Sequence, residues 1–121
     1  RFHSCPMDDA HAFSAMCYIE RNPVRARMTR IPWRYRWSSA AAHTGERNPP
    51  PVLDMEAWHE LAPGINWKEM LTQADDPQIQ AALRLNTRTG RPLADDSFLS
   101  KLEHKLGRRL RAFPVGRPKK E

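Results

Sequence analysis

Tyr18 and Asn22 stand four residues apart, with Arg21 between them and Arg25 and Arg27 close behind. Residues i and i+4 share one face of a helix, so the phenol and the amide can address one group together. A free phenol has a pKa of about 10 and needs help from a base or a metal to attack at neutral pH. Amide oxygens suit hard cations, and guanidinium groups hold phosphate oxygens. These side chains therefore fit chemistry on a phosphate ester.

The same residues also have ordinary structural roles, which the sequence leaves open. A tyrosine on an amphipathic helix is most often a core or interface aromatic. Asn22 precedes Pro23, and such a pair commonly ends a helix or forms a turn. Tyr35 lies between Trp33 and Trp37 and is expected to pack, with stacking on an unpaired base as the alternative.

The helix that carries Tyr18 should start at a cap, because a carboxylate of Asp8 or Asp9 can accept the free amides of a first turn. Its apolar residues recur at the three- and four-residue spacing of a helix face: Ala12, Phe13, Ala15, Met16 and Ile19. The residue before a proline avoids the helical region, so we expect the helix to end near Asn22 and Pro23. Tyr18 would then lie in the last turn.

Helices joined by irregular segments are predicted along the rest of the chain. Aromatic residues alternate with arginines over 33–37, after a proline, which indicates a turn followed by an extended segment. Further helices are predicted from a cap at Ser38 to Ala42, at 55–61, at 66–73, from 77 to about 85, and after a cap at Asp95 or Asp96. Gly90 and Pro92 indicate a turn, and residues 1–5 form at most the end of a strand.

The chain of 121 residues carries a net charge of +6, arranged in blocks. Residues 1–48 carry +4, residues 49–75 carry −4 and residues 76–121 carry +6. Two basic blocks suit a polyanion such as DNA, because each neutralised phosphate releases counterions, although a solvated surface gives the same pattern. No run approaches the roughly 20 apolar residues of a membrane helix, and the two cysteines form no CxxC pair. We expect a soluble, cytoplasmic protein with reduced thiols, whose chain begins inside a longer protein.

The most specific segment is YIERNPVRA, at residues 18–26. The motifs around it are SCPMD at 4–8, WSSA at 37–40, TGRPL at 89–93, Phe98 with Glu103, Gly107 with Arg108, and GRPK at 116–119. In this order they resemble the C-terminal portion of REP-associated tyrosine transposases, members of the single-tyrosine HUH transposase family. The resemblance covers nearly the whole chain, and the segment from the tyrosine to the Asn-Pro pair is its most specific part.

The resemblance implies a mainly α chain: the C-terminal part of an α+β, ferredoxin-like HUH transposase domain, followed by a helical DNA-binding extension. Residues 1–43 would end the catalytic domain and hold the tyrosine helix, and 44–53 would be a proline-rich linker. Residues 54–113 would form the helical extension, which resembles a helix-turn-helix in outline, and 114–121 a flexible basic tail. The implied activity is cleavage and strand transfer of single-stranded DNA through a 5′-phosphotyrosine, in transposition or in processing of hairpin-forming repeats.

By motif position, Tyr18 would be the nucleophile and Asn22 a ligand of a divalent metal, Mg²⁺ or Mn²⁺. The main ligands in the family are a His-hydrophobe-His pair, which this chain lacks, since its histidines stand singly at 3, 11, 43, 59 and 104. The main metal ligands would thus lie outside this chain, and the chain alone is not expected to be a nuclease. Arg27 stands where the motif usually has a glycine.

The expected partner is DNA, single-stranded or hairpin-forming, bound at the nucleoid without a membrane; monomer and dimer both stay open. The positively charged contacts would be Arg21, Arg25, Arg27, Arg91, Arg108, Arg109, Arg117, Lys119 and Lys120. The GRPK segment resembles the core of an AT-hook, although a solvated basic tail explains it equally well. The alternative function is a non-catalytic DNA-binding module or an inactive transposase remnant.

Overall fold

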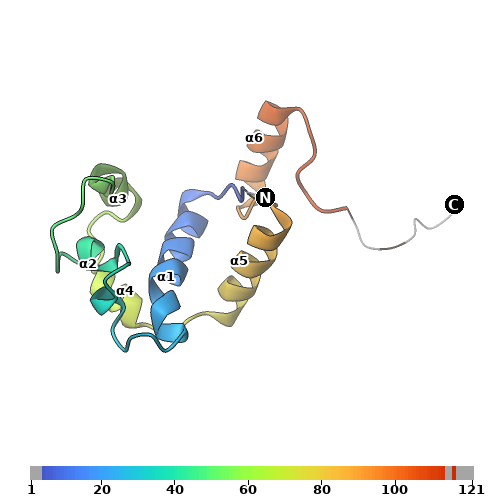
Figure 1. Cartoon of the computed structure of the whole chain (residues 1–121). Helices are drawn as coiled ribbons and strands as arrows, with labels where there is room; N and C mark the ends of the chain where they lie inside the picture. The colour runs from blue at the N-terminus through green and yellow to red at the C-terminus, as the bar shows by residue number, and fades with distance from the viewer. Residues whose placement is uncertain (1–3, 114–115, 117–121) are drawn as a thin grey trace, which may run out of the picture.

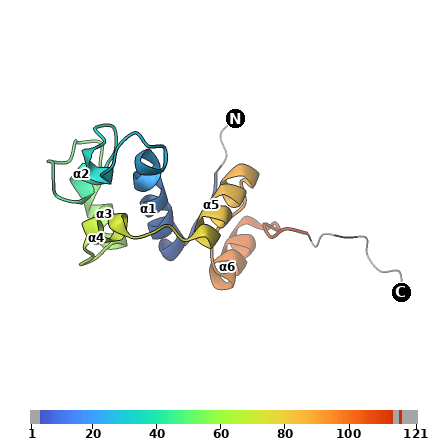
Figure 2. The ribbon, with the colours of Figure 1, turned by 90° about the horizontal axis from the view of Figure 1, so that it is seen from below.

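The computed structural model describes residues 4–113 and residue 116. Its elements are α1 (Asp9–Arg25), the 3-10 helix η1 (Pro32–Arg34), α2 (Ala40–His43), α3 (Met55–Leu61), α4 (Trp67–Thr72), α5 (Pro77–Thr89) and α6 (Asp96–Leu106). The predicted mainly helical class is confirmed, and the described residues contain no strand. Residues 1–3 of the predicted strand end lie outside the described part. Figures 1 and 2 show α1 between α2–α4 on one side and α5 with α6 on the other.

Helix α1 is longer than the sequence predicts. It does not end at Asn22 and Pro23 but continues to Arg25, so the predicted end is wrong. Pro23 donates no backbone hydrogen bond, but its side chain is buried, and the ladder resumes where the Ala26 amide donates to the Asn22 carbonyl at 2.9 Å. Packing of the proline ring thus outweighs one missing bond. Tyr18 lies about two turns before the end of α1 rather than in its last turn.

The segment predicted to be extended and aromatic-faced is instead a series of turns, and that prediction is wrong. Residues Pro32–Arg34 form η1, and the Ser38 amide then donates to the Tyr35 carbonyl at 3.2 Å. The turns send the aromatic side chains in different directions. Trp33 packs against the core, whereas Trp37 is 74% exposed.

One core cluster joins α1 to α2, α3 and α4. Its buried residues are Ala40, Trp58, Ala62, Trp67 and Leu71, and Phe13, Met16, Cys17, Trp33, Met55 and Met70 pack against them. The rings of Trp58 and Trp67 meet edge to face, with 4.6 Å between their centroids. Residues from both sides of the proline-rich segment 44–53 share this core, so the segment connects parts of one cluster.

Glu20 is the only charged side chain fully buried among the residues that the structure describes, with an exposed fraction of 0%. Its carboxylate accepts three hydrogen bonds. The donors are the Ser39 hydroxyl, the ring of His43 at 2.6 Å and the indole Nε1 of Trp67 at 2.7 Å. These contacts fasten α1 to α2 and α4 from inside the core.

Helix α5 begins at Pro77, as the sequence predicts, behind the cap residue Asp76. It extends to Thr89 rather than to about residue 85. It ends where Gly90 takes a φ of 67°, a left-handed conformation that glycine adopts without a Cβ clash. No helix of the described chain is long and apolar enough to cross a membrane.

The connection between α5 and α6 is tied to the start of the chain. The Leu93 amide donates to the Pro6 carbonyl at 2.9 Å, and Met7 and Leu93 form an isolated parallel bridge. The Asp95 amide donates to Asp8 Oδ2 at 2.8 Å. Asp8 therefore caps α1 and also holds the first residue before α6.

Replacing Asp8 by alanine should lower the free energy of unfolding by about 1 kcal/mol, the typical value of a lost helix cap. Its carboxylate accepts the His11 amide at 2.9 Å, and this bond, ahead of other causes, lowers the pKa of Asp8. The stabilisation is therefore present above the pKa of the unfolded chain and is lost as the pH falls through the folded pKa.

Urea denaturation followed by circular dichroism, at neutral and at acidic pH, measures both effects. Asp9→Ala is the matched control, because Asp9 is exposed and does not cap α1. The difference in free energy of unfolding between Asp8→Ala and Asp9→Ala should become smaller at acidic pH. An equal loss of stability for both variants at neutral pH would contradict the assignment.

Candidate functional site

Tyr18 faces α5, and its phenol is contacted by two arginines. The phenol oxygen accepts a hydrogen bond from Arg84 Nε at 3.2 Å. The Arg25 guanidinium carbon lies 4.0 Å from the centroid of the Tyr18 ring, a cation–π distance. One positive charge thus lies at the phenol oxygen and another over the ring face.

Asp75 explains why α5 reaches this position. One of its carboxylate oxygens lies 2.8 Å from Arg21 Nη1 and the other 3.1 Å from Arg25 Nη1. These three side chains are only 16–20% exposed, so solvent screens the ion pairs incompletely. The next residue, Asp76, caps α5. The ion pairs therefore hold the start of α5 against α1, and this position brings Arg84 of α5 to the Tyr18 phenol.

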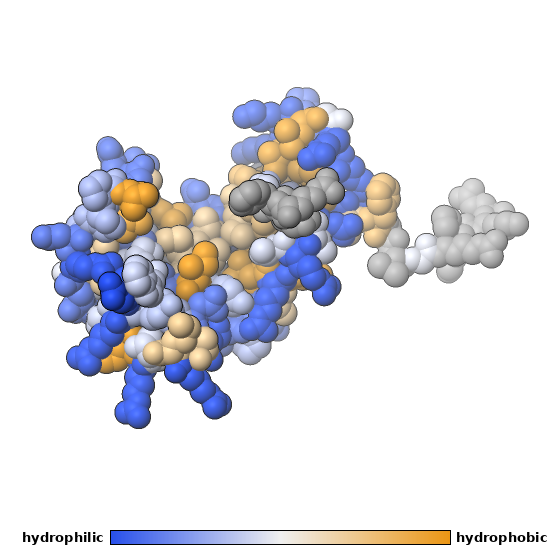
Figure 3. All heavy atoms as spheres, in the orientation of Figure 1, coloured by the Kyte–Doolittle hydropathy of each residue, from blue (hydrophilic) through white to orange (hydrophobic). Residues whose placement is uncertain are grey.

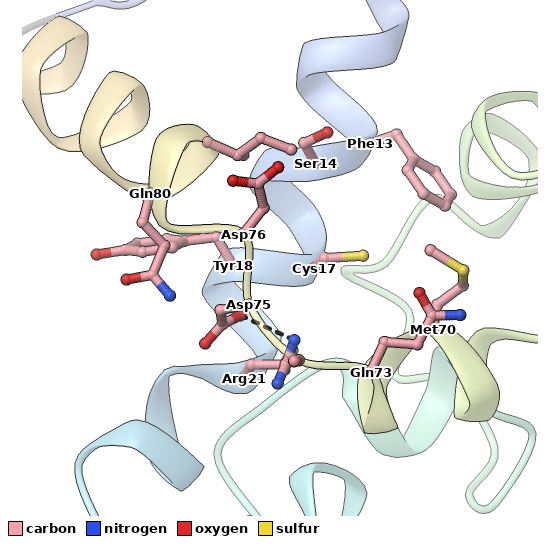
Figure 4. A pocket seen from close by; sticks show the side chains of 12 residues that line it. Phe13, Ser14, Cys17, Tyr18, Arg21, Met70, Gln73, Asp75, Asp76 and Gln80 are labelled. Carbon is pink, nitrogen blue, oxygen red and sulfur yellow. Dashed lines mark ion pairs between the residues drawn. The ribbon is translucent and has the colours of Figure 1, made fainter.

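A cavity of about 180 Å³ opens between α1, α4 and the start of α5. In Figure 4, Cys17 points from α1 toward Met70 and Phe13, Tyr18 points the other way beside Gln80, and Arg21 is paired with Asp75. Burial raises the pKa of Cys17 to about 11, so its thiol stays protonated at neutral pH and is a poor nucleophile. Two hydroxyl groups remain in this wall, those of Tyr18 and Ser14, and the Ser14 hydroxyl donates to the Ala10 carbonyl of its own helix at 3.0 Å.

Tyr18 also lines a second cavity, of about 420 Å³, whose other lining residues come from α1, α5 and Met7. Arg84 and Arg88 contribute its positive charge, and Ile19 and Leu83 part of its apolar wall. A ligand can therefore approach the Tyr18–Arg84 pair along the groove between α1 and α5.

The described residues do not fit a metal site. Asn22 Oδ1, the predicted ligand, accepts a hydrogen bond from Arg25 Nη2 at 3.0 Å, and a dication there would face the guanidinium charge. Both oxygens of Asp75 are paired with arginines. No group of three His, Cys, Asp or Glu side chains that could hold a metal occurs among residues 4–113.

The predicted DNA contacts differ in whether a carboxylate already pairs with them. Arg21 and Arg25 are neutralised in part by Asp75, so they offer less to a phosphate than the sequence indicates. The exposed ones are Arg27, Arg91, Arg108 and Arg109. Arg117, Lys119 and Lys120 lie outside the described residues.

Arg27 adopts a φ of 58° and is the only non-glycine with positive φ in the described part of the chain. The resemblance places a glycine at this position, and a side chain in the left-handed region costs about 1–2 kcal/mol. Arg27→Gly should therefore raise the free energy of unfolding by about 0.5–1 kcal/mol, once the higher entropy of unfolded glycine is counted.

Arg27→Ala is the control, because it removes the guanidinium but keeps the strained Cβ. Thermal or urea denaturation should leave this variant close to the wild type. If glycine and alanine changed stability equally, the side-chain charge rather than the backbone conformation would be responsible.

Three residues with central roles escape sequence reasoning: Arg84, Asp75 and Glu20. Arg84 lies 66 positions from Tyr18 and Asp75 lies 50 from Arg25, in stretches without a motif. The stretch 75–88 reads DDPQIQAALRLNTR, an ordinary helix start followed by scattered polar residues, so no local signal identifies Asp75 or Arg84. Only the packing of α5 against α1 brings Arg84 to the phenol and Asp75 to the two arginines of α1. Glu20 lies within the YIERNPVRA segment, but its buried partners come from α4 and from the residues around α2.

No model of a known protein family, no curated protein and no solved structure matches the chain. The resemblance to tyrosine transposases therefore rests on the motifs of the chain alone.

Proposed function

We propose that Tyr18 is the nucleophile of a single-stranded DNA cleavage and strand-transfer reaction, in a tyrosine transposase whose other active-site groups lie outside this chain. The observation that supports this most is the Arg84 guanidinium at the phenol oxygen, at 3.2 Å. Hydrogen bonding to Tyr18 raises the pKa of Arg84, which keeps its charge. A cation at the attacking oxygen also lies where the oxygens of an incoming phosphate must be held.

The proposed step is a transesterification. The phenol oxygen of Tyr18 attacks phosphorus, the bond from phosphorus to the 3′-oxygen breaks, and a 5′-phosphotyrosine forms. The proton that the phenol loses is balanced by the one that the released 3′-hydroxyl gains. Arg84 holds a non-bridging phosphate oxygen during this exchange, and Arg25 orients the ring from its face.

The proposal extends to the rest of the protein. A ferredoxin-like HUH sheet with the His-hydrophobe-His pair would complete the catalytic domain, and α5, α6 and the basic tail would bind DNA at the nucleoid. The divalent metal of the family would be held mainly by that His-hydrophobe-His pair. Because the described residues form no metal site, none of the step above depends on them as metal ligands.

The test is incubation of the protein from its complete gene with labelled single-stranded hairpin DNA and Mg²⁺ or Mn²⁺. Denaturing electrophoresis should show a protein–DNA adduct, and peptide mass mapping should place it on Tyr18. The 121-residue chain alone should bind this DNA without forming the adduct.

A non-catalytic DNA-binding module is the second candidate. It is favoured by the pairing of Arg21 and Arg25 with Asp75 and by the guanidinium at Asn22, since both contacts have a structural role. Binding of hairpin DNA by the complete protein, with no adduct at any metal concentration, would select this candidate.

A further inference from the structure

We propose that Trp37 is a stacking platform for an unpaired base of single-stranded DNA, at a site separate from Tyr18. The inference rests on the proposed function, because it takes single-stranded DNA as the ligand. It is carried by three features of the segment after α1: the exposure of the indole, the hydrogen-bonded turn that carries it and the surrounding charge.

The Trp37 indole is exposed on a hydrogen-bonded turn. Its exposed fraction is 74%, and the Arg36 guanidinium carbon lies 4.3 Å from the ring centroid. Arg47 donates to the Arg36 and Ser38 carbonyls, at 3.4 Å each. Together with the hydrogen bond from the Ser38 amide to the Tyr35 carbonyl, at 3.2 Å, these contacts stabilise the turn that presents a large apolar side chain to solvent.

The neighbouring aromatic residues show that this exposure is particular to Trp37. Trp33, four residues earlier, packs against the core cluster, and Tyr35 is only partly exposed. The turns of the segment thus bury one indole and present the other. Stacking on a base would cover an apolar surface that the fold leaves in water.

The charge around Trp37 matches a nucleic-acid backbone. Residues 21–45 contain six arginines and no acidic residue. Neither Arg36 nor Arg47 forms an ion pair with a carboxylate of the described residues, unlike Arg21 and Arg25. Figure 3 shows long hydrophilic side chains extending from the end of the molecule where α1 ends. The charge of Arg36 and Arg47 therefore remains available for phosphates.

Together these features define the ligand. Arg36 covers one face of the indole, and the high exposure leaves the other face for a planar base. An unpaired base can insert there, with its phosphates near Arg36 and Arg47, whereas the bases of a duplex are already stacked on one another. A single strand is thereby preferred over a duplex at this site.

Fluorescence anisotropy with labelled oligothymidylate tests this. Trp37→Ala should weaken binding by about tenfold, within the range known for base–aromatic stacking, whereas Trp37→Phe should retain part of the affinity. The salt dependence of binding should stay unchanged, because no phosphate contact is removed. Val52→Ala, which also truncates an exposed apolar side chain, 85% exposed, should bind like the wild type.

Three outcomes would overturn the proposal: wild-type affinity of Trp37→Ala, an equal loss of affinity for a duplex of the same length, or an equal loss in Val52→Ala. The Tyr18 proposal has its own readout, since it depends on the covalent adduct. Absence of the adduct together with Trp37-dependent binding would reject the nuclease and retain the platform.

Discussion

Tyr18→Phe should abolish the covalent DNA adduct completely while changing the affinity for single-stranded hairpin DNA by no more than about twofold. The substitution removes only the phenol oxygen, the atom that would bond to phosphorus. Without this nucleophile the transesterification cannot take place. The ring stays, and with it the stacking contact of Arg25. Denaturing electrophoresis measures the adduct and fluorescence anisotropy measures the affinity.

Tyr35→Phe provides the matched control, since Tyr35 is the other tyrosine of the chain. This variant should form the adduct at the wild-type rate. An adduct in Tyr18→Phe would move the nucleophile elsewhere, and loss of the adduct in both variants would indicate a general effect of losing a hydroxyl. The pair of variants therefore tests the assignment of the reacting atom and not only the presence of activity.

Glu20→Ala should lower the free energy of unfolding by about 3 kcal/mol or more, because each buried donor left without an acceptor costs about 1–3 kcal/mol. The change leaves the Ser39 hydroxyl, the His43 ring and the Trp67 indole without their acceptor. All of these face a carboxylate that is 0% exposed, so water cannot readily replace it. Since domains are stable by only about 5–15 kcal/mol, a large fraction of this variant should be unfolded in modest urea.

Urea denaturation followed by circular dichroism measures this loss. Glu60→Ala removes an exposed glutamate of α3 and should change stability by less than about 0.5 kcal/mol. Glu20→Gln should lie between the two, because an amide keeps one acceptor oxygen but turns a donor toward another donor. Wild-type stability of Glu20→Ala would show that the network contributes little to the fold.

Local signals in the sequence predict most of the helices. The range 55–61 for α3 and the start of α5 at Pro77 are confirmed. Of the two candidates that the sequence offers for each cap, Asp8 rather than Asp9 caps α1, and Asp95 rather than Asp96 caps α6. Each of these depends on residues within one or two turns of each other: a carboxylate that reaches the next amides, or a proline that suits a first turn. The adjacency of Tyr18 and Asn22 on one helix face belongs to the same class.

Long-range packing settles what local signals cannot. The sequence predicts a helix end at Pro23, yet burial of its ring carries α1 on to Arg25. The alternating aromatics look equivalent in the sequence, yet the turns after α1 bury Trp33 and expose Trp37. Which of two similar side chains enters a core depends on the elements that meet there, and these come from distant parts of the chain.

The candidate site likewise has features that the sequence predicts and contacts that only the packing of the helices creates. The types and spacing of Tyr18, Asn22 and the nearby arginines are features of one helix and can be seen in the chain. The contact of Arg84 with the phenol oxygen and the pairing of Asp75 with two arginines join residues 50 or more positions apart. Such contacts form only once α5 docks on α1, because burial and ion pairing between distant segments set that position, and no short-range preference of the backbone encodes it.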